Sequence, residues 1–292
     1  MYQKAFTLRE IAELARVSHT TVSRVLNGHP GVKEATRNRV LDVLRHNKLF
    51  LNENIPLKDS RKPNLLGLIV SDIGNQFYAE LARGIEDKAS EKGYSVIFCS
   101  TDNEPNKLGK YIDLLKGVIV KGLIIASTRL REKSVENLIE QQFPLVLVNR
   151  NLRSGNANYV VLDNEAGAYL ITEHLINIGY RRIAGIFGPT NLSTGIERLK
   201  GYRKALRKNR LPLKEELIFQ GPFTKESGYR NTKDLLSLEE RPQAIFGGND
   251  YIALGIFEAV QEQGLRVPKD IAVVGFDDTE LAANPRINLT TV

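Results

Sequence analysis

The sequence predicts an α/β protein with a small all-α N-terminal module followed by two doubly wound parallel-sheet subdomains. From residue 65 onward, short apolar runs alternate with longer amphipathic stretches, which is typical of buried parallel strands joined by helices. This alternation restarts once after "PLVLVNR", whereas the first sixty residues carry helical patterns. We therefore expect a module over residues 1–48, a linker over 49–62, and subdomains over 63–161 and 162–292.

The first predicted helix begins after Thr7. Thr7 and Glu10 form a capping box, in which each side chain accepts a hydrogen bond from the other residue's backbone N–H. The helix should end near Arg16, and its inward apolar stripe is expected to comprise Leu8, Ile11, Ala12 and Leu14.

A second short helix should follow a tight turn. Ser18 can cap this helix, and its expected inward face comprises Val22, Val25 and Leu26. "VKEATRNRVLDVLRHNK" then supplies a third helix. Such a layout, with small polar side chains near the start of the second helix, is typical of a helix-turn-helix that reads the major groove of DNA. The alternative is an ordinary helical hairpin with a polar outer face.

Positive charge is concentrated in this module. Residues 1–63 hold 12 Lys+Arg and 6 Asp+Glu, a net charge of +6, whereas the other 229 residues hold 29 and 28. A basic module on a near-neutral body favours a polyanionic partner, and Arg24 can pair with guanine or contact phosphate. A solvated basic face without a partner is the alternative.

The body should be built from alternating strands and helices. The predicted strands are "LLGLIV", "YSVIFCS", "GLIIAS", "PLVLVN", "RRIAGIF", "QAIFGG" and "IAVVGF", and Gly93, Gly179 and Gly264 are expected to end helices. Ligands of doubly wound sheets bind outside the carboxyl ends of the strands. The polar stretches "SDIGNQFY", "GPTNLSTGIERLKG", "ND" and "DD" follow four strands, so we expect them to line a cleft suited to a polar small molecule.

The composition argues against several other classes of protein. Hydrophobic residues make up 42% and charged residues 26%, with no apolar run of membrane-spanning length and no signal-peptide pattern, which favours a soluble cytoplasmic protein without membrane contact. Cys99 is the single cysteine, and His174 stands alone on a predicted helix. The common phosphate-loop, dinucleotide, nucleophile-elbow and zinc-protease motifs are absent. We expect no enzymatic activity, no metal site and no cofactor.

Several blocks of sequence resemble one protein family. "TLREIAELARVSHTTVSRVLNG" is similar to the N-terminal module of the LacI/GalR family of bacterial transcription regulators, and the resemblance continues through "NQFYAELARGIEDKASEKGY", "LDNEAGAYLITEHLINIGYRRIA", "RLKGYRKAL", "GGNDYIALGIFEAV" and "VPKDIAVVGFDD". It implies a helix-turn-helix followed by a periplasmic-binding-protein-like effector domain. The implied function is a repressor that binds a near-palindromic operator in double-stranded DNA as a homodimer. A small polar effector, such as a sugar, would control it.

The resemblance also assigns DNA contacts. The family's base-reading positions are matched by His19, Thr20 and Arg24, and its helix-capping or phosphate-holding positions by Ser18, Thr21, Ser23 and Asn27. We add Thr7 to this DNA-binding set, while Val17, Val22 and Val25 match packing positions. Arg16 replaces the usual turn glycine, where a positive φ is expected to cost modest strain.

The linker departs from the family pattern. Relatives have a hinge helix that inserts a Leu into the minor groove, but here Pro56 stands where an Arg is expected and Lys58 where the Leu is expected. Proline is unfavourable inside a helix, which suggests a shortened or shifted hinge that kinks DNA less. Leu57 is then the candidate wedge, and the candidate phosphate contacts are Lys58, Arg61 and Lys62.

For the cleft, the resemblance implies effector contacts at Asp72, Asn75, Phe77, Asp163, Arg198, Phe223, Asn249 and Asp277. Local roles are the alternatives. Asp277 could cap a turn, Phe77 could belong to the core, Asn249 or Asp250 could cap the following helix, and Arg198 could lie on the surface. The effector itself does not follow from these residues.

Relatives continue beyond the final "LTTV", and Asn288 replaces a usual Pro. The resemblance therefore implies a C-terminally truncated regulator with an unpaired sheet edge, or a fragment of a longer product. Among other functions, a sugar-binding transport receptor shares the bilobed fold and is the main alternative. An enzyme of doubly wound fold is more distant.

Overall fold

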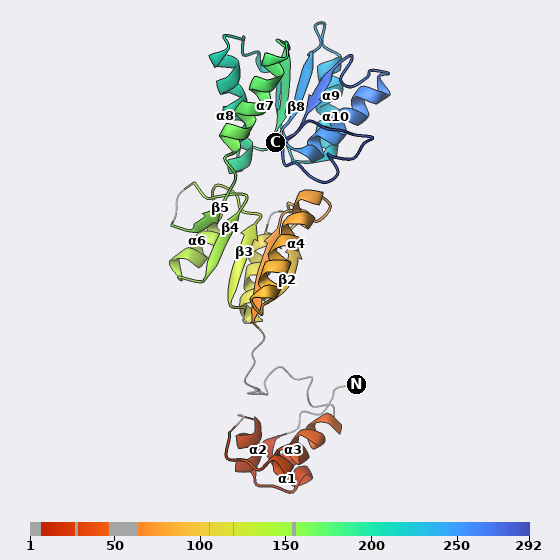
Figure 1. The fold of residues 1–292 in the computed structure, drawn as a ribbon. Coiled ribbons are helices and arrows are strands. Elements are labelled where there is room, and N and C mark those ends of the chain that lie inside the picture. The colour runs from red at the N-terminus through yellow and green to blue at the C-terminus, as the bar shows by residue number, and fades with distance from the viewer. Residues whose placement is uncertain (1–6, 27–28, 47–63, 105, 119, 154–155) are drawn as a thin grey trace. The chain divides into compact units, whose positions relative to one another are not determined.

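A computed structural model describes residues 7–26, 29–46, 64–104, 106–118, 120–153 and 156–292 (Figure 1). The chain divides into two compact units, Met1–Asn64 and Leu65–Val292. The first unit contains three helices in its described residues, namely α1 (Leu8–Ala15), α2 (His19–Leu26) and α3 (Glu34–His46). The second contains two parallel sheets with helices on both faces of each sheet. The predicted fold class is confirmed.

The three helices of the first unit enclose a small apolar core. The predicted capping box is present, since Glu10 N donates to Thr7 Oγ1 over 3.3 Å and Thr7 N donates to Glu10 Oε2 over 2.7 Å. The predicted apolar stripe of α1 is partly wrong, because Leu8 and Leu14 are exposed while Ala15 is buried. Ala15 lies four residues after Ile11 and therefore on the same helix face. The core comprises Ile11, Ala12, Ala15, Val22, Val25, Leu26, Val40 and Leu44.

The turn between α1 and α2 has the strained backbone expected from the sequence. Arg16 adopts a left-handed conformation with φ 51° and ψ 50°, and the next N–H, from Val17, donates to the Ala12 carbonyl over 3.0 Å. Ser18 Oγ then accepts from Thr21 N over 3.1 Å, so Ser18 caps α2 as predicted. This geometry is a helix-turn-helix.

The first sheet of the body has the strand order β2-β1-β3-β4-β5, and every pair is parallel. Its strands are β1 (Leu65–Val70), β2 (Ser95–Ser100), β3 (Gly122–Ala126), β4 (Leu145–Val148) and β5 (Asn158–Val160). Successive β1 residues pack on opposite faces. Ile69 packs with α5 (Lys107–Gly117) and α6 (Lys133–Glu140), whereas Leu68 and Val70 pack with α4 (Gln76–Glu91). The sheet is therefore doubly wound.

The second sheet repeats this plan with the order β7-β6-β8-β9. Its strands are β6 (Ile183–Phe187), β7 (Ile218–Gln220), β8 (Ala244–Gly247) and β9 (Ala272–Val274). One face is covered by α7 (Asn164–Asn177) and α8 (Ser193–Lys208), and the other by α9 (Lys225–Leu236) and α10 (Asp250–Glu262), as Figure 1 shows. A short 3₁₀ turn, Glu215–Leu217, precedes β7. The second sheet begins at β6, and the strands β5 and β7 are not among the seven strands predicted from the sequence.

Glycines fix two features of these helices. The glycines expected to end helices, Gly93, Gly179 and Gly264, all have positive φ values of 73°, 108° and 69°. Paired helices on the second sheet also approach closely at glycines. A Cβ added at Gly201 of α8 would lie 2.2 Å from the Glu165 carbonyl of α7, and one at Gly255 of α10 would lie 1.9 Å from the Lys225 carbonyl of α9. These positions admit no side chain without movement of the backbone.

Residues near Val292 lie along the edge strand β9. Val274 forms a parallel bridge with Thr290, Gly275 N donates to the Thr290 carbonyl over 2.9 Å, and Asp277 N donates to the Val292 carbonyl over 2.8 Å. Asp250 fixes the same segment, because its carboxylate accepts from the hydroxyls of Thr279 and Thr291. The residues before Val292 therefore pair with this end of β9.

Candidate functional site

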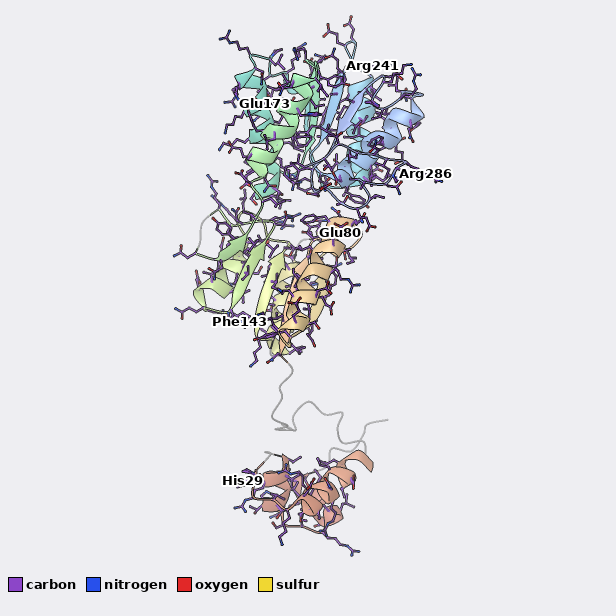
Figure 2. All side chains as sticks on the ribbon, in the orientation of Figure 1. His29, Glu80, Phe143, Glu173, Arg241 and Arg286 are labelled. Atoms are coloured by element: carbon purple, nitrogen blue, oxygen red, sulfur yellow. The ribbon has the colours of Figure 1, made fainter. Side chains whose placement is uncertain are left out.

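The outer face of α2 presents the predicted base-reading side chains. His19, Thr20 and Arg24 are exposed, while Val22, Val25 and Leu26 on the opposite face are buried. Figure 2 labels His29 beyond the end of α2, where its Nδ1 accepts from Gly31 N and its carbonyl accepts from Arg37 Nη2. The Arg37 bond joins His29 to α3, and Val22, Val25 and Leu26 pack in the core of this unit, so the exposed face belongs to a packed helix.

The other predicted DNA contacts have local roles or lie outside the described residues. The Ser18 and Thr21 hydroxyls are 2.8 Å apart and hold the first turn of α2, and the Thr7 hydroxyl belongs to the capping box. Ser23 is half-buried. Asn27, Leu57, Lys58, Arg61 and Lys62 lie outside the described residues, so the hinge hypothesis remains a prediction.

In the body, the two sheets and their helices form lobes that meet at the carboxyl ends of the strands. Leu130 N donates to the Asn191 carbonyl over 2.9 Å, and Asn151 N donates to Ser193 Oγ over 3.2 Å. Glu280 N donates to Glu80 Oε1 over 3.1 Å, and Figure 2 labels Glu80 at the end of α4 nearest the second lobe. Loops of both lobes therefore contribute to the same region.

Six of the eight predicted effector contacts surround one small pocket of about 20 Å³ in this region. They are Asn75, Phe77, Arg198, Phe223, Asn249 and Asp277, and the other lining residues are Tyr78, Asn149, Arg150 and Thr194. Asp72 and Asp163 line none of the cavities described here. Polar groups from both lobes line the pocket, but its volume is little more than that of one water molecule.

Arg198 is the most completely bonded side chain of this pocket. It is 3% exposed, and its Nε donates to Asn164 Oδ1 over 2.9 Å, its Nη1 to the Gly248 carbonyl over 2.7 Å and its Nη2 to Asp277 Oδ1 over 3.0 Å. Its guanidinium carbon lies 3.7 Å from the centre of the Phe276 ring. The alternative that Arg198 lies on the surface is wrong. A guanidinium held on all sides is a preorganised binding group for a polar ligand.

Asp277 faces Arg198 from the loop after β9. Its side chain is 5% exposed. Burial raises the pKa of its carboxyl group to about 6, although Arg198 opposes this shift. Burial likewise lowers the pKa of Arg198, and Asp277 opposes that shift. The pair therefore places a proton-sensitive carboxyl group in the wall of the pocket.

Three of the predicted effector contacts also cap helices. Asn75 Oδ1 accepts from Phe77 N over 3.1 Å, Asp163 Oδ1 from Ala166 N over 2.9 Å, and Asn249 Oδ1 from Ile252 N over 2.8 Å. The local alternative for Asn249 is thus present. Asp163 is exposed, and its hydrogen bond caps α7. Asp72 Oδ1 accepts from Gly74 N within its own turn.

A second, larger cavity of about 580 Å³ adjoins this pocket through Arg150 and Phe223, which line both. Its volume is within the range of small-molecule sites. It lies among the loops after β2, β3, β6 and β7, and its polar lining includes Asn103, Ser127, Arg129, Lys133, Asn137 and Asn191. The effector contacts predicted from the sequence include none of these residues, nor Asn149 and Arg150, although Asn191 lies in the polar stretch "GPTNLSTGIERLKG" that was expected to line the cleft. A signal was present for Ser127, Arg129, Asn149 and Arg150, which lie at the ends of predicted strands or just after them, whereas Lys133 and Asn137 belong to α6.

No helix among the described residues is both long and apolar enough to cross a membrane. Within the same residues, no group of three or more His, Cys, Asp or Glu side chains is arranged to hold a metal ion.

The fold and site thus define a two-part protein with a helix-turn-helix unit and a bilobed small-molecule-binding unit. Comparison with known families agrees. Residues 7–47 match the family described as "Bacterial regulatory proteins, lacI family", and residues 64–290 match "Periplasmic binding proteins and sugar binding domain of LacI family".

Individual relatives match nearly the whole chain. Catabolite control protein A of Priestia megaterium is 37% identical over 98% of this chain and 86% of the relative. The structure of a transcriptional regulator CelR–cellobiose complex has a TM-score of 0.70 and 32% identity over 98% of this chain and 87% of the other. A lac repressor dimer bound to operator and the anti-inducer ONPF has a TM-score of 0.69 and 28% identity, over 99% and 87% of the two chains.

The chain belongs to the LacI family of bacterial transcription regulators. Its curated relatives are transcription regulators, which agrees with the prediction that the chain has no enzymatic activity.

Proposed function

We propose that this regulator is a repressor that binds a near-palindromic operator as a homodimer. The proposal rests on one observation. The well-packed helix α2 exposes His19, Thr20 and Arg24 on its outer face. Short side chains let a helix sit deep in the major groove, and Arg24 can donate two hydrogen bonds to guanine. One helix-turn-helix buries too little surface for tight specific binding, so two copies would read two half-sites. The site of action would then be the cytoplasm.

In this proposal, a small polar effector binds in the cleft between the lobes of the body. Arg198, Asn249 and Asp277 would contact it from the second lobe, and Asn75 and Phe77 from the first, because these side chains surround one pocket. Phe223 would pack against an apolar face of the ligand. Binding would change how the lobes meet and thereby DNA affinity, with a coupling of about 1 to 3 kcal/mol.

The main alternative function is that of a sugar-binding transport receptor. A receptor would share the bilobed body, but the chain also contains a helix-turn-helix unit that matches bacterial regulators over residues 7–47.

Selection of duplexes from a random pool, followed by filter binding at several salt concentrations, tests the DNA-binding proposal. The full chain should enrich a near-palindromic sequence, and its affinity should fall steeply with salt because bound phosphates release counterions. Arg24→Gln should weaken binding to the selected duplex by about tenfold or more. Lys110→Gln, which removes an exposed charge from α5 in the other unit, is the matched control and should have no effect. Failure to enrich any sequence would overturn the proposal.

A further inference from the structure

Three helices of the body begin at the 580 Å³ cavity without a side-chain cap. The residues before α5, α6 and α8 are Asn106, Glu132 and Leu192, and none of their side chains accepts a hydrogen bond from a backbone N–H of its helix. All three line the cavity. The first N–H groups of a helix have no partner within the helix and carry partial positive charge, so they favour an anion.

The other four α-helices of the body behave differently. Asn75, Asp163, Thr224 and Asn249 cap α4, α7, α9 and α10 through their side chains, and none of these caps lines the cavity. Among the described α-helices of the body, those without a side-chain cap are therefore the ones that begin at this cavity.

Two buried polar side chains in the cavity wall have unused hydrogen-bonding atoms. Arg150 is 4% exposed, and its Nη2 donates to the Tyr78 hydroxyl over 2.9 Å, while its Nε has no partner within the described residues. Ser127 is 9% exposed, and its hydroxyl also has none there. Leaving such groups without a partner is costly, which points to a ligand that accepts hydrogen bonds.

Among the described residues that line the cavity, positively charged side chains without an ion pair outnumber negatively charged ones. Arg129 and Lys133 line the cavity beside Arg150, and neither Arg129 nor Lys133 forms an ion pair within the described residues. Two carboxylates also line it. Glu104 is paired with Lys107 over 2.7 Å, and Glu132 accepts a hydrogen bond from the Ser134 hydroxyl over 3.0 Å.

We propose that the effector carries a phosphate group that binds in this cavity, so that the effector is a phosphorylated, sugar-sized metabolite. This inference rests on the proposed effector-controlled function and specifies its ligand class. A phosphate monoester presents three acceptor oxygens and up to two negative charges, which match several N–H groups and cations better than a single carboxylate does. Arg150 and Phe223 line both cavities, so the uncharged part of the ligand can extend along them toward Arg198 and Asp277.

Calorimetric titration of the full chain with inorganic phosphate is the decisive test. Phosphate should bind, and Arg129→Gln and Lys133→Gln should each weaken it by about tenfold, because each removes a charge-assisted hydrogen bond. Glu132→Gln should strengthen binding by about twofold to fivefold, because it removes a competing anion from the start of α6. Arg131→Gln is the control, since Arg131 is exposed and does not line the cavity. No binding, or an equal effect of Arg131→Gln, would overturn the proposal.

Matched ligand pairs then define the ligand class. Glucose 6-phosphate and ribose 5-phosphate should bind at least tenfold more tightly than glucose and ribose, and glucuronate should bind more weakly than glucose 6-phosphate. Neutral sugars that bind as tightly, or a preference for glucuronate, would contradict a phosphate site. If a neutral sugar alone releases operator DNA at constant ionic strength, the proposed function stands and this inference fails. If phosphates bind but DNA affinity never changes, this inference about the phosphate site stands and the proposed effector-controlled function fails.

Discussion

Arg198 Nη2 lies 3.0 Å from Asp277 Oδ1, and both side chains are almost completely buried. The two residues are far apart in sequence, and they meet only because α8 begins and β9 ends at the same edge of the second sheet. The first two predictions follow from this ion pair.

Arg198→Met should destabilise the body by about 3 to 5 kcal/mol at pH 7, because it leaves the carboxylate of Asp277 buried without its partner. Arg203→Met is the matched control. Arg203 pairs with the exposed Glu215 over 3.3 Å, and the loss of such a pair should cost less than about 1 kcal/mol. Urea denaturation measures both variants, and similar losses in the two would show that the buried pair has no special role.

The stability of the wild type relative to Asp277→Asn should fall as the pH rises. The pKa of Asp277 is raised from 3.8 to about 6 in the folded protein, so between these values the folded state binds more protons at this site than the unfolded state. The difference corresponds to about 2 kcal/mol between pH 4 and pH 7. Denaturation of both proteins across this range measures it, and a constant difference would show that the pKa is not raised.

Gly201→Ala should destabilise the second lobe by about 1 to 3 kcal/mol, because the new Cβ would lie 2.2 Å from the Glu165 carbonyl. Gly84→Ala provides the opposite case. Nothing lies within 4 Å of a Cβ at Gly84 on α4, so the better helix propensity of alanine should stabilise the protein by about 0.5 to 1 kcal/mol. Thermal denaturation distinguishes the two signs, and equal shifts would contradict the close contact between α7 and α8.

Arg16→Gly should stabilise the helix-turn-helix by up to about 1 kcal/mol, because glycine adopts φ 51° without steric cost. Amide hydrogen exchange of α1 and α2 in the full chain measures this local stability. Arg16→Ala keeps the steric cost and should give no gain. A gain in the alanine variant would locate the effect in the side chain instead of the backbone.

The sequence predicted the fold because each local signal agreed with the global one. Apolar runs marked seven of the nine described strands but not the short β5 and β7, Gly93, Gly179 and Gly264 marked helix ends, and Thr7 and Ser18 marked helix starts. The failure in α1 concerned Leu8 and Leu14, where hydrophobicity suggested burial but the helix face pointed to solvent. Hydrophobic side chains on a surface are common, so the residue type alone could not place them.

The candidate site was predicted less completely. Arg198, Asn249 and Asp277 follow strands of the second lobe, and the structure brings them together. The same rule applies to Ser127, Arg129, Asn149 and Arg150, which follow strands of the first lobe, but only one loop of that lobe was considered. Which helix starts lack a cap, and which polar atoms lack a partner, depends on side-chain positions that no local pattern determines.

The glycine contacts of the second lobe have a mechanical consequence. At Gly228 and Gly255 the backbones of α9 and α10 touch directly, as α7 and α8 do at Gly201, so neither helix of a pair can slide past the other. Interlocked layers of this kind resist internal shear. A displacement imposed at the mouth of the lobe should therefore move each helix pair as a single rigid body.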